Sequence, residues 1–261
     1  MGEIIYGEIF TVIWSFTKLN AFEQCPYAYY LKYVLKQKGD NNFFSQTGSA
    51  MHKVLELLAN GELKIDNAIK KFDELWSEVD SSEVKNSIAE SSYWSCIDYL
   101  GGLTGHELDK YNVLMTEGKV NFTRNGNEFI GFIDLLLQEK DTKDLIIVDH
   151  KSHKKLLGKN GKPLKSEINT LRDYKRQLYM YSTPIIEKYN QTPKKLVWNH
   201  FKSGDLTVVP FDWDEYREAW DWATELIDKI MNEEAFENKE DFFFCKNICN
   251  FRHECEYLED E

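Results

Sequence analysis

The chain has 261 residues, a net charge of −12, and 42% hydrophobic and 14% aromatic residues. This length can bury one core with a small appended element, and the apolar content excludes an intrinsically disordered protein. The acidic balance argues against a uniformly basic surface for nucleic acid, so any binding of phosphate groups must depend on a local basic patch.

No apolar run approaches the roughly 18 residues of a membrane span. The first residues lack the basic stretch of a secretion signal, and Tyr6 stands where N-myristoylation requires Ser or Thr. Five cysteines, an odd number, argue against a framework of disulfides. We therefore expect a cytoplasmic protein with no membrane partner.

Helical patterns extend to about residue 110. Ser15 or Thr17 is placed to cap the first helix, and Pro26 predicts a break or a new first turn within it. The segment from about 40 to 110 is interpreted as a helical insertion in front of a sheet. We expect helices at about 15–35, 48–58, 65–79 and 82–100.

Beyond residue 110 the hydrophobic pattern changes to the alternation typical of strands. Asn125-Gly126 predicts a tight hairpin turn between the first two strands, and Pro193 opens a later one. A long helix is expected from Asp212 or Asp214 to about residue 235. We expect strands at about 111–123, 127–138, 144–151, 193–201 and 206–211, with a loop at 152–169 and a helix at 170–189.

This order of elements predicts an α/β fold made of one domain over residues 1–261. Its centre is a mixed sheet, 111–211, flanked by helices. The cysteine-rich tail, 240–261, is expected to pack on the segment around Cys25.

Two apolar runs end in charged residues that suit a metal site. Asp134 ends the first run, Gly131-Phe-Ile-Asp134, and Asp149-His150-Lys151 ends the second. Because strand side chains alternate between faces, Asp149 and Lys151 point the same way and His150 points the other way. A hairpin through the intervening loop can bring Asp134 beside Asp149. The alternative is that these charges merely end strands.

Two carboxylates and one ammonium on a single patch suit a hard divalent cation and the phosphate that it activates. Lys151 could hold or deprotonate a water molecule, or offset negative charge in the transition state. The pattern therefore favours metal-assisted hydrolysis of phosphodiesters.

Two other residues are candidates for the same site. His52, four residues after Gly48 on a predicted helix, could add a ring nitrogen, which suits Mn²⁺ somewhat better than Mg²⁺; the alternative is a structural or surface histidine. Glu117, in the strand before the hairpin turn, could lie near Asp134 and bind a second metal or a water molecule. A solvated strand residue is its alternative reading.

Gln177 and Tyr181 lie four residues apart, hence on one face of the predicted helix 170–189. Tyr181 is compatible with a place in the core, whereas Gln177 could hydrogen-bond a phosphate or a base. The loop 152–169 contains five lysines and a single acid, and we interpret it as a mobile flap that binds the phosphate backbone rather than a merely solvated loop. The five are Lys154, Lys155, Lys159, Lys162 and Lys165.

Three cysteines, Cys245, Cys249 and Cys255, lie within the last 17 residues. Three thiolates need a fourth ligand, which Cys25 could supply if the first helix packs against the tail; Cys96 and His253 are the other candidates. Four thiolates suit Zn²⁺ or an iron–sulfur cluster, and the spacing does not separate the two. The alternative is a set of unrelated buried cysteines.

In their order along the chain these motifs resemble the RecB-type nucleases of the PD-(D/E)XK superfamily. The likeness is to the iron–sulfur branch, which includes the AddB nuclease domain and the four-cysteine CRISPR adaptation nucleases, and it extends over residues 25 to 255. The motifs are Cys25-Pro26, His52, Gly131-x-x-Asp134, Asp149-x-Lys151, Gln177-x-x-x-Tyr181 and the three late cysteines.

The resemblance implies a restriction-endonuclease-like mixed sheet and a role for each motif. His52, Asp134, Asp149 and the backbone carbonyl of His150 would bind Mg²⁺ or Mn²⁺, and Lys151 would be the catalytic lysine. A place beside the active site, in contact with DNA, is implied for Gln177 and Tyr181. The resemblance further implies that a [4Fe–4S] cluster, with Zn²⁺ as the alternative occupant, joins the two chain ends through Cys25, Cys245, Cys249 and Cys255.

The activity implied is that of a metal-dependent deoxyribonuclease in DNA recombination or repair. We expect an exonuclease that acts on DNA ends or single strands and leaves 5′-phosphates. The sequence has no Gly-x-x-x-x-Gly-Lys-Ser/Thr phosphate loop. The resemblance therefore indicates a stand-alone nuclease or one subunit that works with helicase, recombination or adaptation proteins. The alternatives are a non-catalytic DNA-binding or assembly subunit on a nuclease scaffold, and a zinc-stapled protein unrelated to DNA.

Overall fold

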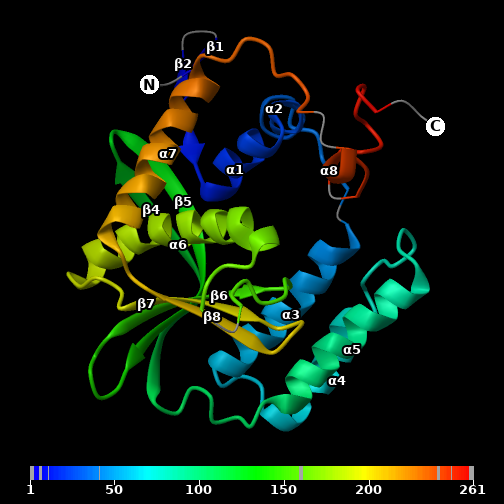
Figure 1. Ribbon diagram of the computed structural model, residues 1–261, viewed down its shortest axis with the longest axis vertical. Coiled ribbons are helices and arrows are strands. Elements are labelled where there is room, and N and C mark those ends of the chain that lie inside the picture. Colours follow the sequence, from blue (N-terminus) through cyan, green and yellow to red (C-terminus); the bar gives the residue numbers. More distant parts are fainter. Residues whose placement is uncertain are drawn as a thin grey trace.

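A computed structural model describes residues 3–5, 8–10, 12–40, 42–158, 161–239, 242–247 and 249–258. Within these residues the chain forms a six-stranded mixed sheet with helices on both faces (Figure 1). A separate antiparallel pair, β1 (Glu3–Ile5) and β2 (Glu8–Phe10), lies near the N-terminus. None of the helices in the described ranges is long and apolar enough to cross a membrane.

The N-terminal helices follow the cap and break signals of the sequence. Ser15 accepts a hydrogen bond from the Lys18 amide and so caps α1 (Phe16–Gln24). The chain breaks at Cys25, whose extended backbone and side-chain sulfur cap α2 (Pro26–Tyr29). A π-helical turn, η1 (Tyr30–Val34), continues it. The break at Pro26 is confirmed.

The helical segment interpreted from the sequence as an insertion has its own apolar core. It consists of α3 (Phe43–Ala59), α4 (Ala68–Trp76) and α5 (Asn86–Gly102), with the turn η2 (Ile65–Asn67) between the first two helices. Helix α3 begins five residues earlier than the apolar pattern predicts, because Asn42 caps it through the Ser45 amide. Met51, Phe72 and Cys96 are fully buried in this second core.

The sheet has the order β3-β5-β6-β7-β8, and β4 pairs with β5 outside that path. Asn125 and Gly126, both at positive φ, form the hairpin turn between β4 and β5, as predicted. Strand β6 runs antiparallel to β5 and parallel to β7. The strands are β3 (Ile13–Trp14), β4 (Tyr111–Arg124), β5 (Asn127–Glu139), β6 (Leu145–Lys151), β7 (Lys195–His200) and β8 (Asp205–Pro210).

The two faces of the sheet are covered by different helices. One face packs on α1, α6 (Ile168–Tyr189, after the turn η3, Lys165–Glu167) and α7 (Trp213–Met231), and forms the main core with Leu136, Ile147 and Trp198. The other face, with Leu137 and Val148, packs near the end of α3. Because β6 is buried on both faces, it is a nearly continuous apolar run.

The C-terminal tail lies against the N-terminal helices. Phe251 and Cys249 pack on Leu31, and the Asp40 amide donates to the Asn250 carbonyl at 2.7 Å. A short helix, α8 (Phe242–Asn247), precedes this contact. The sequence patterns did not reveal β1, β2, β3 or α8, since all are too short for periodicity to register.

Candidate active site

Four polar groups from α3, β4, β5 and β6 converge where β5 and β6 part. His52 on α3 lies with one ring nitrogen (Nε2) 2.9 Å from the His150 carbonyl oxygen. Its other ring nitrogen (Nδ1) lies 3.1 Å from Glu117 Oε1 and 3.6 Å from Asp134 Oδ2. The structure thus brings together residues that are more than 60 positions apart in sequence.

The end of the β5–β6 ladder accounts for the position of the carboxylates. The last hydrogen-bonded pair joins Leu135 to Val148, so Asp134 and Asp149 follow at the point where the strands separate. Asp134 Oδ2 accepts the His150 amide at 2.6 Å, which replaces the next ladder bond and fixes the carboxylate. The carboxylates therefore face the gap between the strands.

Glu117 reaches the site through an irregularity in β4. Val113 pairs with Leu137 but Met115 pairs with Leu136, so Leu114 is an extra residue in a β-bulge. Gly118 then pairs with Ile133, which places Glu117 across from Asp134 instead of Ile133. Its φ of 41° lies in the left-handed region, a strain of about 1–3 kcal/mol that is common at functional sites.

Lys151 is held in place by three partners. Its ammonium lies 2.8 Å from Asp149 Oδ2, donates to Gln177 Oε1 at 3.0 Å, and sits 4.6 Å above the ring of Tyr174. Burial opposes the charge of Lys151, but the Asp149 carboxylate prevails and raises its pKa. The residue is therefore a rigid ammonium group beside the two carboxylates.

The electrostatics of the site suit a divalent cation. Burial and the nearby Asp149 carboxylate raise the pKa of Asp134 to about 7. Burial opposes the charge of His52, but the bond to Glu117 and the Asp134 carboxylate raise its pKa to about 9. His52, Glu117 and Asp134 offer ligand atoms within 4.8 Å of one another. Oxygen and nitrogen donors in this arrangement fit Mg²⁺ or Mn²⁺.

The ring of Tyr181 lies directly on the backbone of Gly131. A Cβ at position 131 would stand 2.6 Å from Cε1 of that ring, so any other residue there would collide with α6. Gln177, one turn earlier on α6, hydrogen-bonds Tyr181 as well as Lys151. The close contact between Gly131 and Tyr181 therefore sets the distance between α6 and the sheet at the site.

The lysine-rich segment after β6 is anchored rather than loose. Leu156 is fully buried, Leu157 forms a β-bridge with Pro163, and His153 pairs with Glu167 at 2.7 Å. These contacts hold the two ends of the segment, and the mobile phosphate-binding flap expected from the sequence stays a prediction. Four of the predicted lysines are exposed, and Lys159 lies outside the described residues. The four are Lys154, Lys155, Lys162 and Lys165.

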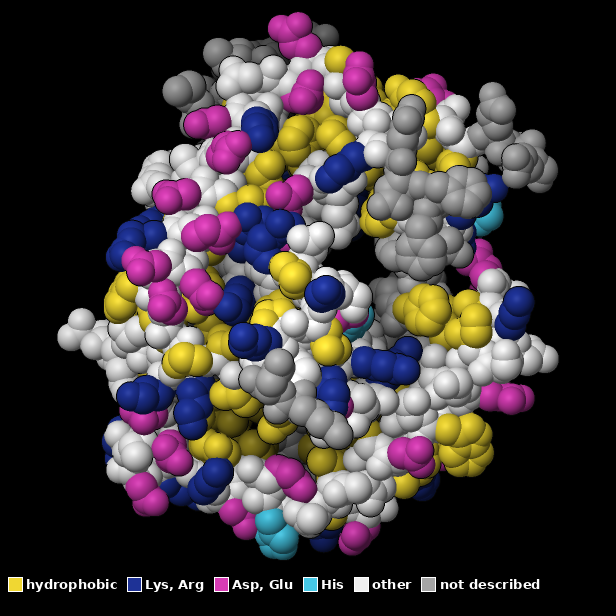
Figure 2. All heavy atoms as spheres, viewed as in Figure 1, with side chains coloured by type: hydrophobic (Ala, Val, Ile, Leu, Met, Phe, Trp, Pro, Cys, Tyr) yellow, Lys and Arg dark blue, Asp and Glu magenta, His cyan; other side chains and the backbone are white. Residues whose placement is uncertain are grey.

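Basic side chains gather in the middle of one face of the molecule (Figure 2). Several of them lie beside a hollow between the first helices, α3 and α6, whereas acidic side chains are frequent along the outer edge formed by α7. This local reversal of sign in a chain of net charge −12 provides the basic patch that phosphate binding requires.

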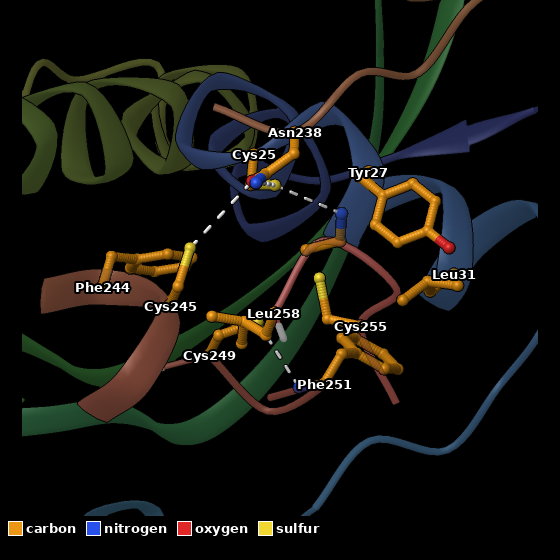
Figure 3. A pocket seen from close by; sticks show the side chains of 11 residues that line it. Cys25, Tyr27, Leu31, Asn238, Phe244, Cys245, Cys249, Phe251, Cys255 and Leu258 are labelled. Atoms are coloured by element: carbon orange, nitrogen blue, oxygen red, sulfur yellow. Dashed lines mark hydrogen bonds between the residues drawn. The ribbon is translucent and has the colours of Figure 1, made fainter. Parts of the chain in front are cut away.

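Four cysteines from both ends of the chain line one pocket (Figure 3). They are Cys25, Cys245, Cys249 and Cys255, and none of them forms a disulfide within the described residues. Cys25 Sγ accepts the Ala28 amide at 3.5 Å and Cys249 Sγ accepts the Phe251 amide at 3.4 Å, as is usual for sulfurs that ligate a metal or cluster. The structure thus brings to one pocket the four cysteines expected from the sequence, and their binding of a cluster or a metal stays a prediction.

The other two ligand candidates lie elsewhere. Cys96 is buried in the separate core of the insertion. His253 is exposed beside Asp40 and Glu83.

Sequence reasoning missed three residues around the site. Tyr174 lies three residues before Gln177 on α6, and that spacing could have revealed it as a neighbour of Lys151. Asn199 donates to both the Tyr99 hydroxyl (2.7 Å) and His150 Nδ1 (3.0 Å). This bond, together with burial that lowers the pKa of His150 to about 3, keeps the ring neutral and fixed. No local pattern marks Tyr99 or Asn199.

The model of the PD-(D/E)XK nuclease superfamily matches residues 13–256. The chain belongs to this superfamily. Its mixed sheet flanked by helices agrees with the fold of the superfamily, which confirms the fold class expected from the sequence. Of the predicted resemblance, membership of the superfamily is confirmed, and membership of the iron–sulfur branch stays a prediction.

Partial relatives of this PD-(D/E)XK protein are named as components of a larger enzyme. A 78-residue stretch is 36% identical to a subunit of the ATP-dependent helicase/deoxyribonuclease of Clostridium perfringens strain SM101, and 35% identical to that of strain 13. The stretch covers 28% of this chain and 6% of either relative. The chain therefore matches only a small part of their length.

A crystal structure of a protein from Eubacterium rectale, provisionally assigned as an exonuclease, has a similar fold. The TM-score is 0.58 at 10% sequence identity, over 95% of this chain and 90% of that one. At this identity the likeness supports the PD-(D/E)XK fold alone.

Proposed function

We propose that the protein is a metal-dependent DNA nuclease, an exonuclease that acts on DNA ends or single strands and leaves 5′-phosphates. The observation that carries the proposal is the ion pair between the buried Asp149 and the half-buried Lys151, beside Asp134 and His52. Burying two carboxylates and an ammonium costs stability. A nuclease site explains that cost, whereas a purely structural or assembly role does not.

In this proposal His52, Asp134, Asp149 and the His150 carbonyl hold Mg²⁺ or Mn²⁺. The cation supplies Lewis-acid activation of the phosphate and of the attacking water. Glu117 is placed to orient a water molecule or a second cation, since its carboxylate lies next to His52.

Lys151 has the role of a fixed proton donor and charge stabiliser. Its ammonium can donate to an oxygen of the phosphate as negative charge builds in the transition state. Gln177 and the ring of Tyr174 keep the ammonium from turning away, and Asp149 keeps it charged. Because these partners are in place before substrate binds, little reorganisation is needed during reaction.

The exposed lysines after β6 are proposed to bind the phosphate backbone. Affinity for DNA should then fall steeply with salt, because each phosphate contact releases counterions. The partners proposed are DNA and, by analogy with the names of the partial relatives, a helicase or another recombination or adaptation protein.

The cysteine pocket is proposed to hold a [4Fe–4S] cluster, with Zn²⁺ as the alternative. The support is that four cysteines from the two chain ends line one pocket without forming disulfides within the described residues, and that amide groups point at two of the sulfurs. Its role would be structural, since Cys25 lies on the N-terminal helices and the other three cysteines lie on the tail.

The test is cleavage of end-labelled single- and double-stranded DNA with Mg²⁺ or Mn²⁺, using anaerobically purified protein. We expect metal-dependent cutting that is lost in Lys151→Ala and kept in Lys195→Ala, a control at an exposed lysine on the neighbouring strand. The product ladder gives the polarity. A folded wild type that binds DNA without cutting it would instead support the non-catalytic subunit.

A further inference from the structure

Three features follow one another along α3 at intervals of four residues: Phe44, Gly48 and His52. Residues four apart lie on one face of a helix. With a rise of 1.5 Å per residue, Phe44 lies about 12 Å along the axis from His52. A strip of α3 therefore leads away from the candidate metal site.

Gly48 has no packing reason to be a glycine. A Cβ built at this position meets no atom of the described residues within 4 Å, and Gly48 lies inside the helix where glycine is unfavourable relative to alanine. By contrast, Gly131 is required by the ring of Tyr181. Gly48 therefore leaves open space beside α3 within the part of the chain that the structure describes.

Phe44 is an exposed aromatic side chain beside a fixed cation. Its exposed fraction is 43%, whereas the neighbouring Phe43 is buried. The ammonium of Lys202 lies 5.2 Å from the centre of the Phe44 ring and donates to Ser92 Oγ at 3.3 Å. An open ring with a cation beside it can stack a base and contact a phosphate at once.

The strip borders the hollow of the basic face. Figure 2 shows hydrophobic and basic side chains beside this hollow, on the side where α3 begins. Phe201, the residue before Lys202, lies 6.4 Å from His52 between ring centres. Phe201 and Lys202, which directly follow β7, therefore lie alongside α3 between the candidate metal site and Phe44.

We propose that Phe44, Gly48 and Lys202 form a subsite for single-stranded DNA, a proposal that rests on the nuclease function above. Phe44 stacks on a base, Lys202 contacts a phosphate, and the bare backbone of Gly48 leaves room for the strand between Phe44 and the metal site. At 3.4 Å per stacked nucleotide, about 12 Å corresponds to roughly three or four nucleotides from the scissile phosphate. The subsite therefore selects single strands, whose bases are free to stack.

The first test measures the affinity of a fluorescent single-stranded oligonucleotide by anisotropy in EDTA, where no cleavage occurs. Stacking predicts that Phe44→Ala weakens binding by about 5- to 150-fold. Phe44→Trp restores affinity, and Phe44→Leu, equally apolar but without an aromatic face, does not. The control is Trp94→Ala, which removes an exposed aromatic of α5 outside the strip. Equal affinities of wild type, Phe44→Ala and Phe44→Leu overturn the proposal.

The second test uses Gly48, where stability and binding should move in opposite directions. Gly48→Ala raises the urea midpoint, because alanine favours the helix, while Gly48→Leu lowers the affinity for single strands at least tenfold. Gly102→Ala, at the equally open end of α5, is the control for binding. Unchanged affinity in a folded Gly48→Leu variant overturns the role of Gly48.

Oligonucleotides with one abasic position locate the contact. Removing the stacked base weakens binding to wild type but not to Phe44→Ala, and the position should lie about three or four nucleotides from the cut. Cleavage by the wild type is measured in parallel. If the wild type cuts DNA but replacing Phe44 does not change the affinity, only the subsite is refuted. If a folded wild type never cuts DNA, the nuclease function itself is refuted.

Discussion

Replacing Gly131 with alanine should push α6, which carries Gln177, away from β5, which carries Asp134. The added Cβ would stand 2.6 Å and 2.9 Å from two carbons of the Tyr181 ring, about 1 Å short of normal contact. The ring is buried against the sheet, so α6 must rise. Overpacking of this kind costs about 1–3 kcal/mol.

The functional loss should exceed this loss of stability. Gln177 lies one turn before Tyr181 and holds Lys151 at 3.0 Å, so a lifted helix releases the ammonium. We expect nuclease activity to fall about 100-fold, since a displacement of about 1 Å at a catalytic group has that effect.

Urea unfolding and single-turnover cleavage measure the two effects separately. Adding Tyr181→Ala to Gly131→Ala removes the clash, so the two changes should be less destabilising together than the sum of their separate costs. Gly102→Ala is a control that meets no neighbour. If Gly131→Ala were as stable and as active as wild type, the contact would have no role in seating α6.

Three more outcomes are expected. Mg²⁺ or Mn²⁺ should raise the melting temperature of EDTA-treated protein, because a ligand bound only by the folded state stabilises that state. Asp134→Ala should abolish this increase, whereas the control Asp141→Ala, at an exposed residue, should keep it. An equal increase in both variants would place the cation elsewhere. The Cys249→Ala protein should lose bound iron or zinc, its chain ends should unfold, and its activity should be abolished. The control Cys96→Ala, in the other core, should retain the metal. A folded, fully active Cys249→Ala protein would contradict a structural centre. Burial lowers the pKa of His200 below its usual 6.5, so folding favours its neutral form. The free energy of unfolding of wild type relative to His200→Gln should therefore fall as the pH drops from 7 to 5, as urea midpoints at the two pH values would show.

Much of the site could be predicted because its residues follow a local rule. Asp134, Asp149 and Lys151 end two neighbouring apolar strands, and strand alternation is enough to put them on one patch. His52 has no such rule. It comes from a separate helix, so the resemblance to a family, and not helical periodicity, indicated its place.

The remaining residues depend on tertiary structure that periodicity does not encode. Glu117 reaches Asp134 only through a bulge at Leu114, which shifts the register by one residue. Asn199 acts through the ring of His150, which a parallel pairing of β6 with β7 brings beside it. The partner of Gly131 is likewise visible only when α6 lies on the sheet.

The proposed metal ligands are divided between the helical insertion and the sheet. His52 belongs to α3, while Asp134 and Asp149 belong to β5 and β6. A cation bound by both parts would therefore couple its own affinity to the docking of α3. A partner that binds α3 and moves it away from the sheet would lower the affinity for the metal. By thermodynamic reciprocity, the bound metal would lower the affinity for that partner by the same factor. The division of ligands thus makes the insertion a natural point for allosteric control of the nuclease.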